Sequence, residues 1–288
     1  MRRWFAFAAA PLLLAQAPPP ASLANTSADQ IIASAPAAHW LAIDPDDIMV
    51  MDTAAGQMLV QLAPAFAPTH VQAIKRLVRE GRFDDGRIVR VQDNYVVQWM
   101  ARPDPLSKPA PLPAEYERPE AGLSFTPSPY ADSYAEAGFI AGWQAARDAK
   151  AGTVWLAHCY GTVGVGRENP PDTGDGSELY TVIGHGPRHL DRNIANVGRV
   201  LAGIEPHAAL PRGTEALGFY KAENQRVKIN RVRLASQIPG FPRWQMMDTA
   251  SASFAAVNKA RANRTGFFVR PAGAADLCTL KVPTRPVP

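Results

Sequence analysis

Cysteine and charge are both scarce in this 288-residue chain. The two cysteines, Cys159 and Cys278, are too few for a disulfide scaffold and lack the paired spacing of a zinc site. Charged residues make up 19% of the sequence and the formal net charge is +4. No run of lysine and arginine reaches the about five to eight residues that mark a basic patch. We therefore expect no nucleic-acid partner.

Long apolar runs are absent after residue 24. Before it, two arginines precede the apolar run Trp4–Ala15, and the small triplet Ser22–Leu23–Ala24 follows. This order predicts a secretory signal peptide over residues 1–24, with an amphipathic or buried helix as the alternative. The run is shorter than the roughly 20 residues of a spanning helix, so we expect no membrane span in the mature chain. Export to an oxidising compartment predicts a disulfide between Cys159 and Cys278.

Several motifs of catalysis are missing as well. The glycine-rich segment 161–166 lacks the G-x-G-x-x-G order of a nucleotide-binding loop, and no G-x-S-x-G marks a hydrolase. His185 and His189 have helical spacing, but Gly186–Pro187 prevents a helix, which favours a polar loop over a metal site. In His158–Cys159, neighbouring strand residues face opposite sides, which favours a structural half-cystine over a thiol catalyst. We expect no metal and no cofactor.

The remaining pattern is one of short segments and frequent turns, with 27 prolines and 21 glycines. It favours a mainly β fold, either a barrel or a sandwich. The segment 102–129 contains eight prolines and no periodicity, so we expect a surface loop there. Helical patterns cover 27–33, 68–80 and 250–263, and 138–149 tolerates a helix. Strand patterns cover 48–52, 58–62, 88–91, 95–100, 153–157, 160–167, 179–183, 195–200 and 226–234.

The order of these segments is informative. Residues 48–100 run strand, turn, strand, helix and two strands that include Ile88–Val89–Arg90 and Tyr95–Val96–Val97–Gln98. Residues 153–200 run from a strand through a glycine loop to Gly176–Ser177–Glu178–Leu179–Tyr180 and His189–Leu190–Asp191. This order resembles the cyclophilin-type peptidyl-prolyl cis-trans isomerases.

The resemblance implies a closed antiparallel eight-stranded β-barrel with capping helices. The barrel domain would cover residues 48–235, with the proline-rich segment 102–129 as an insertion. Residues 25–47 would form a lead-in and residues 236–288 a C-terminal extension. The segment after Gly203 contains Pro206 and Pro211, so we expect the family's second capping helix to be short or lost.

The resemblance also assigns roles to residues. Arg90 matches the catalytic arginine, and Gln98 matches the glutamine that orients it. Gly166 and Arg167 match the backbone segment that aligns the substrate. Residues that match the family's proline pocket or its surroundings are Tyr95, Val96, Glu178, Tyr180, His189, Leu190 and Ile194.

Two departures from the family pattern bear on activity. Glu178 replaces a glutamine, and we expect it to form an ion pair with Arg90 that orients the guanidinium but weakens its charge toward a substrate. Tyr180 replaces a phenylalanine and makes the pocket floor narrower and more polar. A cyclophilin fold with reduced isomerase activity is the resulting hypothesis.

The first functional hypothesis is an isomerase that acts on X–Pro bonds of exported proteins during folding. The second is a module that binds proline-containing segments as a chaperone or docking surface, with negligible turnover. A third is a regulatory role in which the segment 102–129 docks over the groove. The expected partners are proline-containing segments of exported proteins, the expected state is a monomer, and the resemblance favours the periplasm.

Overall fold

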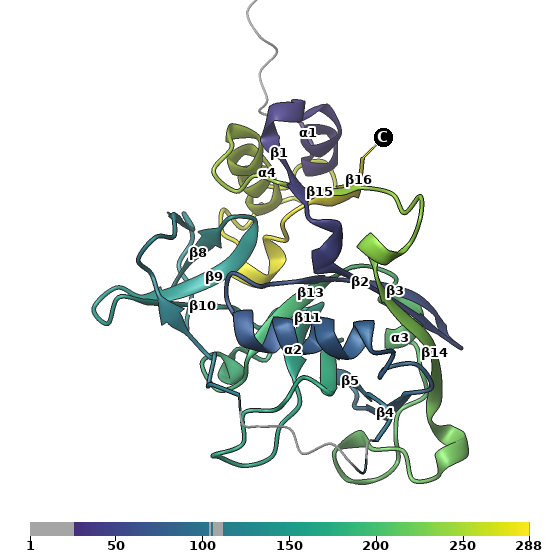
Figure 1. Ribbon diagram of the computed structural model, residues 1–288. Coiled ribbons are helices and arrows are strands. Elements are labelled where there is room, and N and C mark those ends of the chain that lie inside the picture. The colour runs from purple at the N-terminus through teal and green to yellow at the C-terminus, as the bar shows by residue number, and fades with distance from the viewer. Residues whose placement is uncertain (1–25, 104, 106–111, 288) are drawn as a thin grey trace, which may run out of the picture.

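The computed structural model describes residues 26–103, 105 and 112–287, so the predicted signal peptide lies outside the described residues. Its centre is a closed antiparallel barrel of eight strands, which confirms the predicted fold class (Figure 1). Around the barrel the strands follow the order β11 (Thr162–Val165), β12 (Glu178–Val182), β5 (Val96–Met100), β4 (Arg87–Val91), β14 (Val227–Leu234), β2 (Ile48–Thr53), β3 (Gly56–Leu62) and β13 (Asn196–Ala202).

Alternation along β2 shows how the barrel is packed on both faces. Met49 and Met51 point into the barrel core together with the fully buried Trp99. Ile48 and Val50 point outward, yet they are buried in a second apolar cluster formed with the ends of the chain. Period-two alternation therefore places two separate cores on the two sides of one strand.

The helix that the periodicity predicts over 68–80 is α2 (Pro68–Arg79), and it covers one opening of the barrel, as the resemblance implies. Pro68 occupies the first turn, where its missing N–H costs nothing, and Val71, Ile74 and Val78 pack into the barrel core. The chain then turns at Gly81, whose φ of +65° suits glycine. The second capping helix, α3 (Glu205–Ala208), has only four residues, which confirms the expected shortening.

A second sheet is inserted between β5 and β11. In spatial order its strands are β6 (Arg118–Pro119), β10 (Thr153–Leu156), β9 (Trp143–Asp148), β8 (Glu136–Ile140) and β7 (Phe125–Pro127). The helix that segment 138–149 tolerates is absent, because this segment forms most of the hairpin β8–β9 around Ala141–Gly142, both at positive φ. The expected loop over 102–129 is corrected in part: β6 and β7 lie in it as edge strands, where proline is tolerated.

The lead-in and the C-terminal extension form one layer at the top of Figure 1. Its sheet has the order β1 (Trp40–Ile43), β15 (Trp244–Met247) and β16 (Thr284–Pro286), and helices α1 (Ala28–Ser34) and α4 (Ala252–Ala262) pack beside it. Ser27 caps α1 in the predicted capping box. The rings of Phe139 and Phe254 meet edge to face at 4.7 Å, so this layer also contacts the inserted sheet.

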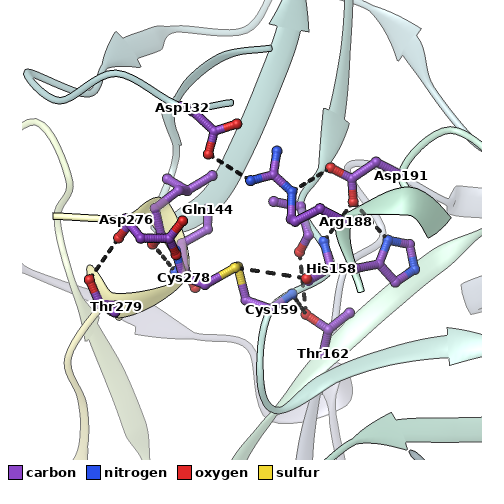
Figure 2. Close-up of a disulfide and its surroundings, with 12 residues drawn as sticks. Asp132, Gln144, His158, Cys159, Thr162, Arg188, Asp191, Asp276, Cys278 and Thr279 are labelled. Atoms are coloured by element: carbon purple, nitrogen blue, oxygen red, sulfur yellow. Dashed lines mark hydrogen bonds and ion pairs between the residues drawn. A yellow bond between two sulfur atoms is a disulfide. The ribbon is translucent and has the colours of Figure 1, made fainter. Parts of the chain in front are cut away.

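Short 3-10 turns connect many of these elements. They are η2 (Ala37–His39), η3 (Pro45–Asp47), η4 (Arg188–Leu190), η5 (Ala216–Gly218), η6 (Glu223–Gln225), η7 (Ala235–Gln237) and η8 (Leu277–Thr279). A disulfide joins Cys159, just after β10, to Cys278 in η8 (Figure 2). Within the described residues, no helix combines the length and apolar character needed to cross a membrane.

Candidate active site

Arg90 lies on β4, and three acceptors from different segments hold its guanidinium. Nη1 donates to Gln98 Oε1 at 2.9 Å, Nε donates to the Leu217 carbonyl at 2.6 Å, and Nη2 donates to Gln92 Oε1. The ring of Phe219 lies 5.3 Å from the guanidinium carbon. The side chain is therefore fixed before any ligand arrives, which is the condition for preorganised hydrogen bonding.

Glu178 contacts Gln98 rather than Arg90, so the expected ion pair is wrong. Gln98 Nε2 donates to Glu178 Oε1, while Gln98 Oε1 accepts from Arg90. The amide therefore separates the two charges, because β5 lies between β4 and β12 in the barrel. Burial lowers the pKa of Arg90, and the charges of Tyr95 and Glu178 oppose that change. An arginine remains protonated in spite of such a shift.

A hollow of about 100 Å³ lies beside the guanidinium. Its lining is formed by Arg90, Tyr95, Val96, Gln98, Val165, Gly166, Arg167, Tyr180 and Ile194. Except for Val165, all of these residues were predicted from the sequence. The Tyr95 ring lies 5.5 Å from the guanidinium carbon, so the charged group and an apolar wall meet at the mouth of the hollow.

Three predicted residues lie outside this lining. Leu190 packs against the apolar cluster of Val96, Tyr180 and Val182. His189 stacks on Tyr95 with a centroid distance of 6.5 Å. These two residues support the wall of the hollow, while Glu178, as described above, lies behind Gln98.

Gly166 and Arg167 follow β11 at the rim of the hollow. The Gly166 N–H donates to the Glu178 carbonyl at 2.8 Å, and a Cβ atom at Gly166 would lie 2.7 Å from Glu178 Cγ. A larger residue at position 166 would therefore have to displace the Glu178 side chain. The Arg167 side chain turns away and donates to the Asn193 carbonyl at 2.9 Å, which leaves the backbone of this segment beside the hollow.

Tyr180 forms the floor, and its hydroxyl is bound below the hollow. The hydroxyl lies 3.0 Å from His158 Nε2, and the whole residue is 5% exposed. Burial raises the pKa of Tyr180 well above 10.0, so the phenol stays neutral. Gly164 pairs with Tyr180 across β11 and β12, and a Cβ atom there would overlap the hydroxyl. Gly164 thus makes room for the ring.

Within the described part of the proline-rich segment, Glu115 docks on α2 instead of over Arg90. Glu115 accepts from the Thr69 and His70 N–H groups at 2.8 and 2.9 Å, and it also contacts His70 Nδ1 at 2.7 Å. A carboxylate at this helix end satisfies otherwise unpaired donors. The Tyr116 ring centroid lies 5.7 Å from the guanidinium carbon of Arg167, so this described part of the segment lies near the rim of the hollow.

Gln92, Leu217, Phe219 and the role of His158 were not predicted from the sequence. Gln92 carried a signal, because it lies two residues after Arg90 and so faces the same side. Leu217 and Phe219 carried none, since the segment around η5 has no periodicity. No three histidine, cysteine or acidic side chains gather as a metal site anywhere in the described residues.

The family model for "Cyclophilin type peptidyl-prolyl cis-trans isomerase/CLD" matches residues 48–234. Proteins named "Probable peptidyl-prolyl cis-trans isomerase" from Brucella suis biovar 1 (strain 1330) and Brucella melitensis biotype 1 are each 25% identical over 182 residues, covering 61% of this chain and 76% of theirs. The crystal structure of cyclophilin AquaCyp293 from Hirschia baltica superposes with a TM-score of 0.71 at 21% identity, covering 90% of this chain and 96% of that one.

These findings place the chain in a class of isomerases that act on peptide bonds before proline. The chain belongs to the cyclophilin-type peptidyl-prolyl cis-trans isomerase family. The matched region ends at Leu234, the last residue of β14, and it spans the inserted sheet. The layer made by the two chain ends lies outside it.

Proposed function

We propose that the protein accelerates cis-trans isomerisation of X–Pro bonds in exported polypeptides, with Arg90 as the catalytic residue. The observation that carries this proposal is the fixed Arg90 guanidinium at the mouth of an apolar hollow. In the proposed pose, the pyrrolidine ring enters the hollow between Val96 and Tyr180. The preceding carbonyl then rotates outside it.

The chemistry requires no nucleophile and no redox group. Resonance gives the X–Pro bond its rotation barrier of about 18–20 kcal/mol. When the bond twists, the prolyl nitrogen regains its lone pair and becomes a hydrogen-bond acceptor, and an Arg90 N–H can donate to it. The hydrogen bond from Arg90 forms only while the X–Pro peptide bond twists. It therefore stabilises the transition state more than the bound ground state, which lowers the barrier. Each 1.36 kcal/mol gained in this way raises the rate about tenfold.

Export is supported by the N-terminal pattern and by the disulfide. Disulfides persist in oxidising compartments, and the Cys159–Cys278 bond joins the C-terminal extension to the rest of the fold. We propose a periplasmic location and a role in the folding of other exported proteins. Loss of export when residues 2–24 are deleted, measured by fractionation of cells, is the expected result.

Proline binding without turnover is the second candidate, and the Gln98–Glu178 contact favours it. The Glu178 carboxylate is two hydrogen bonds away from Arg90. Its negative charge reduces the positive potential by which the Arg90 guanidinium would attract the prolyl nitrogen. In that case the hollow would bind a proline segment and the barrier would stay high.

The deciding experiment compares isomerisation of an X–Pro peptide by the mature protein, by Arg90→Ala and by Arg231→Ala. Arg231 is a matched control because it is an exposed barrel arginine on β14 that pairs with Asp52 and does not line the hollow. Loss of a preorganised hydrogen-bond donor lowers an enzyme's rate about 100-fold or more. We expect a loss of this size for Arg90→Ala and no loss for Arg231→Ala. A rate unaffected by Arg90→Ala would refute the assignment. Peptide binding without any acceleration would favour the second candidate.

A further inference from the structure

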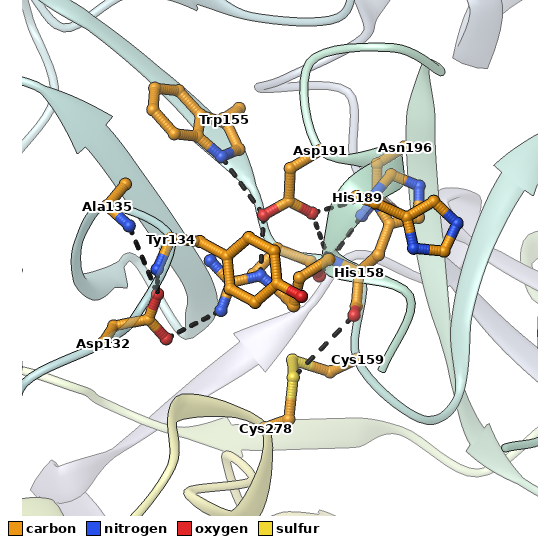
Figure 3. Close-up of polar contacts among 12 residues, drawn as sticks. Asp132, Tyr134, Ala135, Trp155, His158, Cys159, His189, Asp191, Asn196 and Cys278 are labelled. Atoms are coloured by element: carbon orange, nitrogen blue, oxygen red, sulfur yellow. Dashed lines mark hydrogen bonds and ion pairs between the residues drawn. A yellow bond between two sulfur atoms is a disulfide. The ribbon is translucent and has the colours of Figure 1, made fainter. Parts of the chain in front are cut away.

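His158 is buried beneath the proline hollow, and the proposed mechanism does not use it. It is 1% exposed and bridges two side chains with its two ring nitrogens. Nδ1 lies 3.0 Å from Asp191 Oδ1 (Figure 3). Nε2 lies 3.0 Å from the Tyr180 hydroxyl. The floor of the hollow is therefore tied to a buried carboxylate through an imidazole.

The direction of the Nδ1 hydrogen bond follows from Asp191. Burial acts to raise the pKa of Asp191, but the hydrogen bond from His158 and the positive charge of Arg188 outweigh it and lower that pKa. The ionised carboxylate can only accept, so Nδ1 of His158 carries the proton that it donates. A neutral imidazole with its proton on Nδ1 accepts at Nε2 from the Tyr180 hydroxyl, whereas an imidazolium donates from Nε2 to the hydroxyl oxygen. In both cases His158 Nε2 is the hydrogen-bond partner of the Tyr180 hydroxyl.

The same network reaches the inserted sheet. Arg188, 4% exposed, donates from Nε to Asp191 Oδ2 at 2.7 Å and from Nη1 to Asp132 Oδ2 at 2.8 Å (Figure 2). Asp132 lies between β7 and β8, and its side chain is 2% exposed. Cys278 Sγ lies 3.8 Å from the His158 carbonyl, so the C-terminal extension also packs against this point.

We propose that His158 is a positioning residue of the proline pocket, which holds the Tyr180 ring in the floor, and that Arg188 and Asp132 fix His158 from the inserted sheet. This inference rests on the proposed proline-binding function. Without His158, the Tyr180 hydroxyl would be buried with no partner, which is unfavourable. The ring would then turn toward water in the hollow, where it would compete with the pyrrolidine ring.

The first test is kinetic and uses His158→Phe in the full mature chain. We expect His158→Phe to weaken binding of the substrate and of the transition state equally. KM should therefore rise about tenfold, while kcat stays within about twofold. In a Tyr180→Phe background no hydroxyl needs a partner, so we expect His158→Phe to change KM less than about twofold there. His158→Gln, which retains an acceptor oxygen, should recover most of the KM. An equal rise of KM in both backgrounds would overturn the inference.

The second test addresses the inserted sheet with two matched acid-to-amide changes. Asp132→Asn weakens the contact with Arg188, whereas Glu136→Gln weakens a more exposed pair with Arg147 in the same sheet. We expect KM to rise about threefold in Asp132→Asn, in line with the charged hydrogen bond it weakens, and to stay unchanged in Glu136→Gln. Equal effects of the two changes would overturn the role of Asp132.

The failure of the proposed function is distinguishable from the failure of this inference. If the unaltered protein shows no acceleration, the Kd of the X–Pro peptide replaces KM as the readout for the same variants. Tyr180-dependent changes in Kd would support the positioning role even though catalysis had failed. If the unaltered protein binds no X–Pro peptide, both proposals are wrong.

Discussion

Replacing Glu178 by glutamine tests whether its charge weakens Arg90. In the structure, Glu178 Oε1 accepts from Gln98 Nε2, and Gln98 Oε1 accepts from Arg90 Nη1. A glutamine at this position still offers an amide oxygen to Gln98, so the orientation of Arg90 should be retained. The change therefore removes a negative charge while it conserves the hydrogen bonds. We expect kcat/KM for an X–Pro peptide to rise.

The magnitude follows from the separation of the two charges. Two hydrogen bonds and one amide group place them about 6–7 Å apart. At an effective dielectric constant of about 20, such a pair interacts by about 2.5 kcal/mol. Arg90 is only half-buried, and solvent screening reduces the interaction to about 0.5–1 kcal/mol. If this whole amount acts in the transition state, kcat/KM for Glu178→Gln rises about two- to fivefold.

The assay is the initial rate of isomerisation at substrate concentrations well below KM. Glu223→Gln is the control, because Glu223 is an exposed acid that pairs with Arg87 and Arg226 away from the hollow. We expect no change in this control. A Glu178→Gln protein with unchanged or lower kcat/KM would refute the reasoning. It would indicate that the full carboxylate charge is needed to orient Gln98.

Two further predictions concern stability. Because its pKa is lowered from 3.8 in the folded state, ionised Asp191 contributes stability that is fully present above pH 3.8 and is lost as pH falls through the folded value. Asp191→Asn should lower the free energy of unfolding in urea by about 3–5 kcal/mol at pH 7 and by clearly less at pH 3. Replacing Cys159 and Cys278 by serine opens a connection of 119 residues and should cost about 2–5 kcal/mol, with no further loss on adding a reductant.

The barrel was predictable because its strands carry local signals. Val227–Leu234 alternates cleanly, and the hairpin of β2 and β3 turns at Gly56, which has a φ of +138°. The order of these strands and of the residues around Arg90 then matched a family pattern. Most of the lining of the hollow follows from that order, since adjacent strands bring Gln98 and Tyr180 into register.

Of the inserted sheet, the sequence predicted only the strand over 153–157, which is β10, and the hairpin β8–β9 was missed for a physical reason. The alanine-rich segment over 138–149 has a high helix propensity, which tertiary contacts override. Phe139 and Ile140 pack into two different apolar clusters, and Ala145 and Ala146 are both fully buried between neighbouring strands. These contacts are made by residues far apart in the chain, and no local sequence pattern predicts them. The prediction of an ion pair between Glu178 and Arg90 was wrong for a similar reason. Only the register of β4, β5 and β12 shows that Gln98 lies between the two charged side chains.

The position of His158 explains why segments outside the barrel bear on the candidate site. A β-barrel alone would leave the underside of Tyr180 open to water or to apolar neighbours. Here Asp132 from the inserted sheet and Cys278 from the C-terminal extension both reach the shell around His158. The buried charges of Arg188 and Asp191 are tolerable only because each is paired and hydrogen-bonded. Sequence changes in either added region can therefore alter proline binding without contacting the substrate.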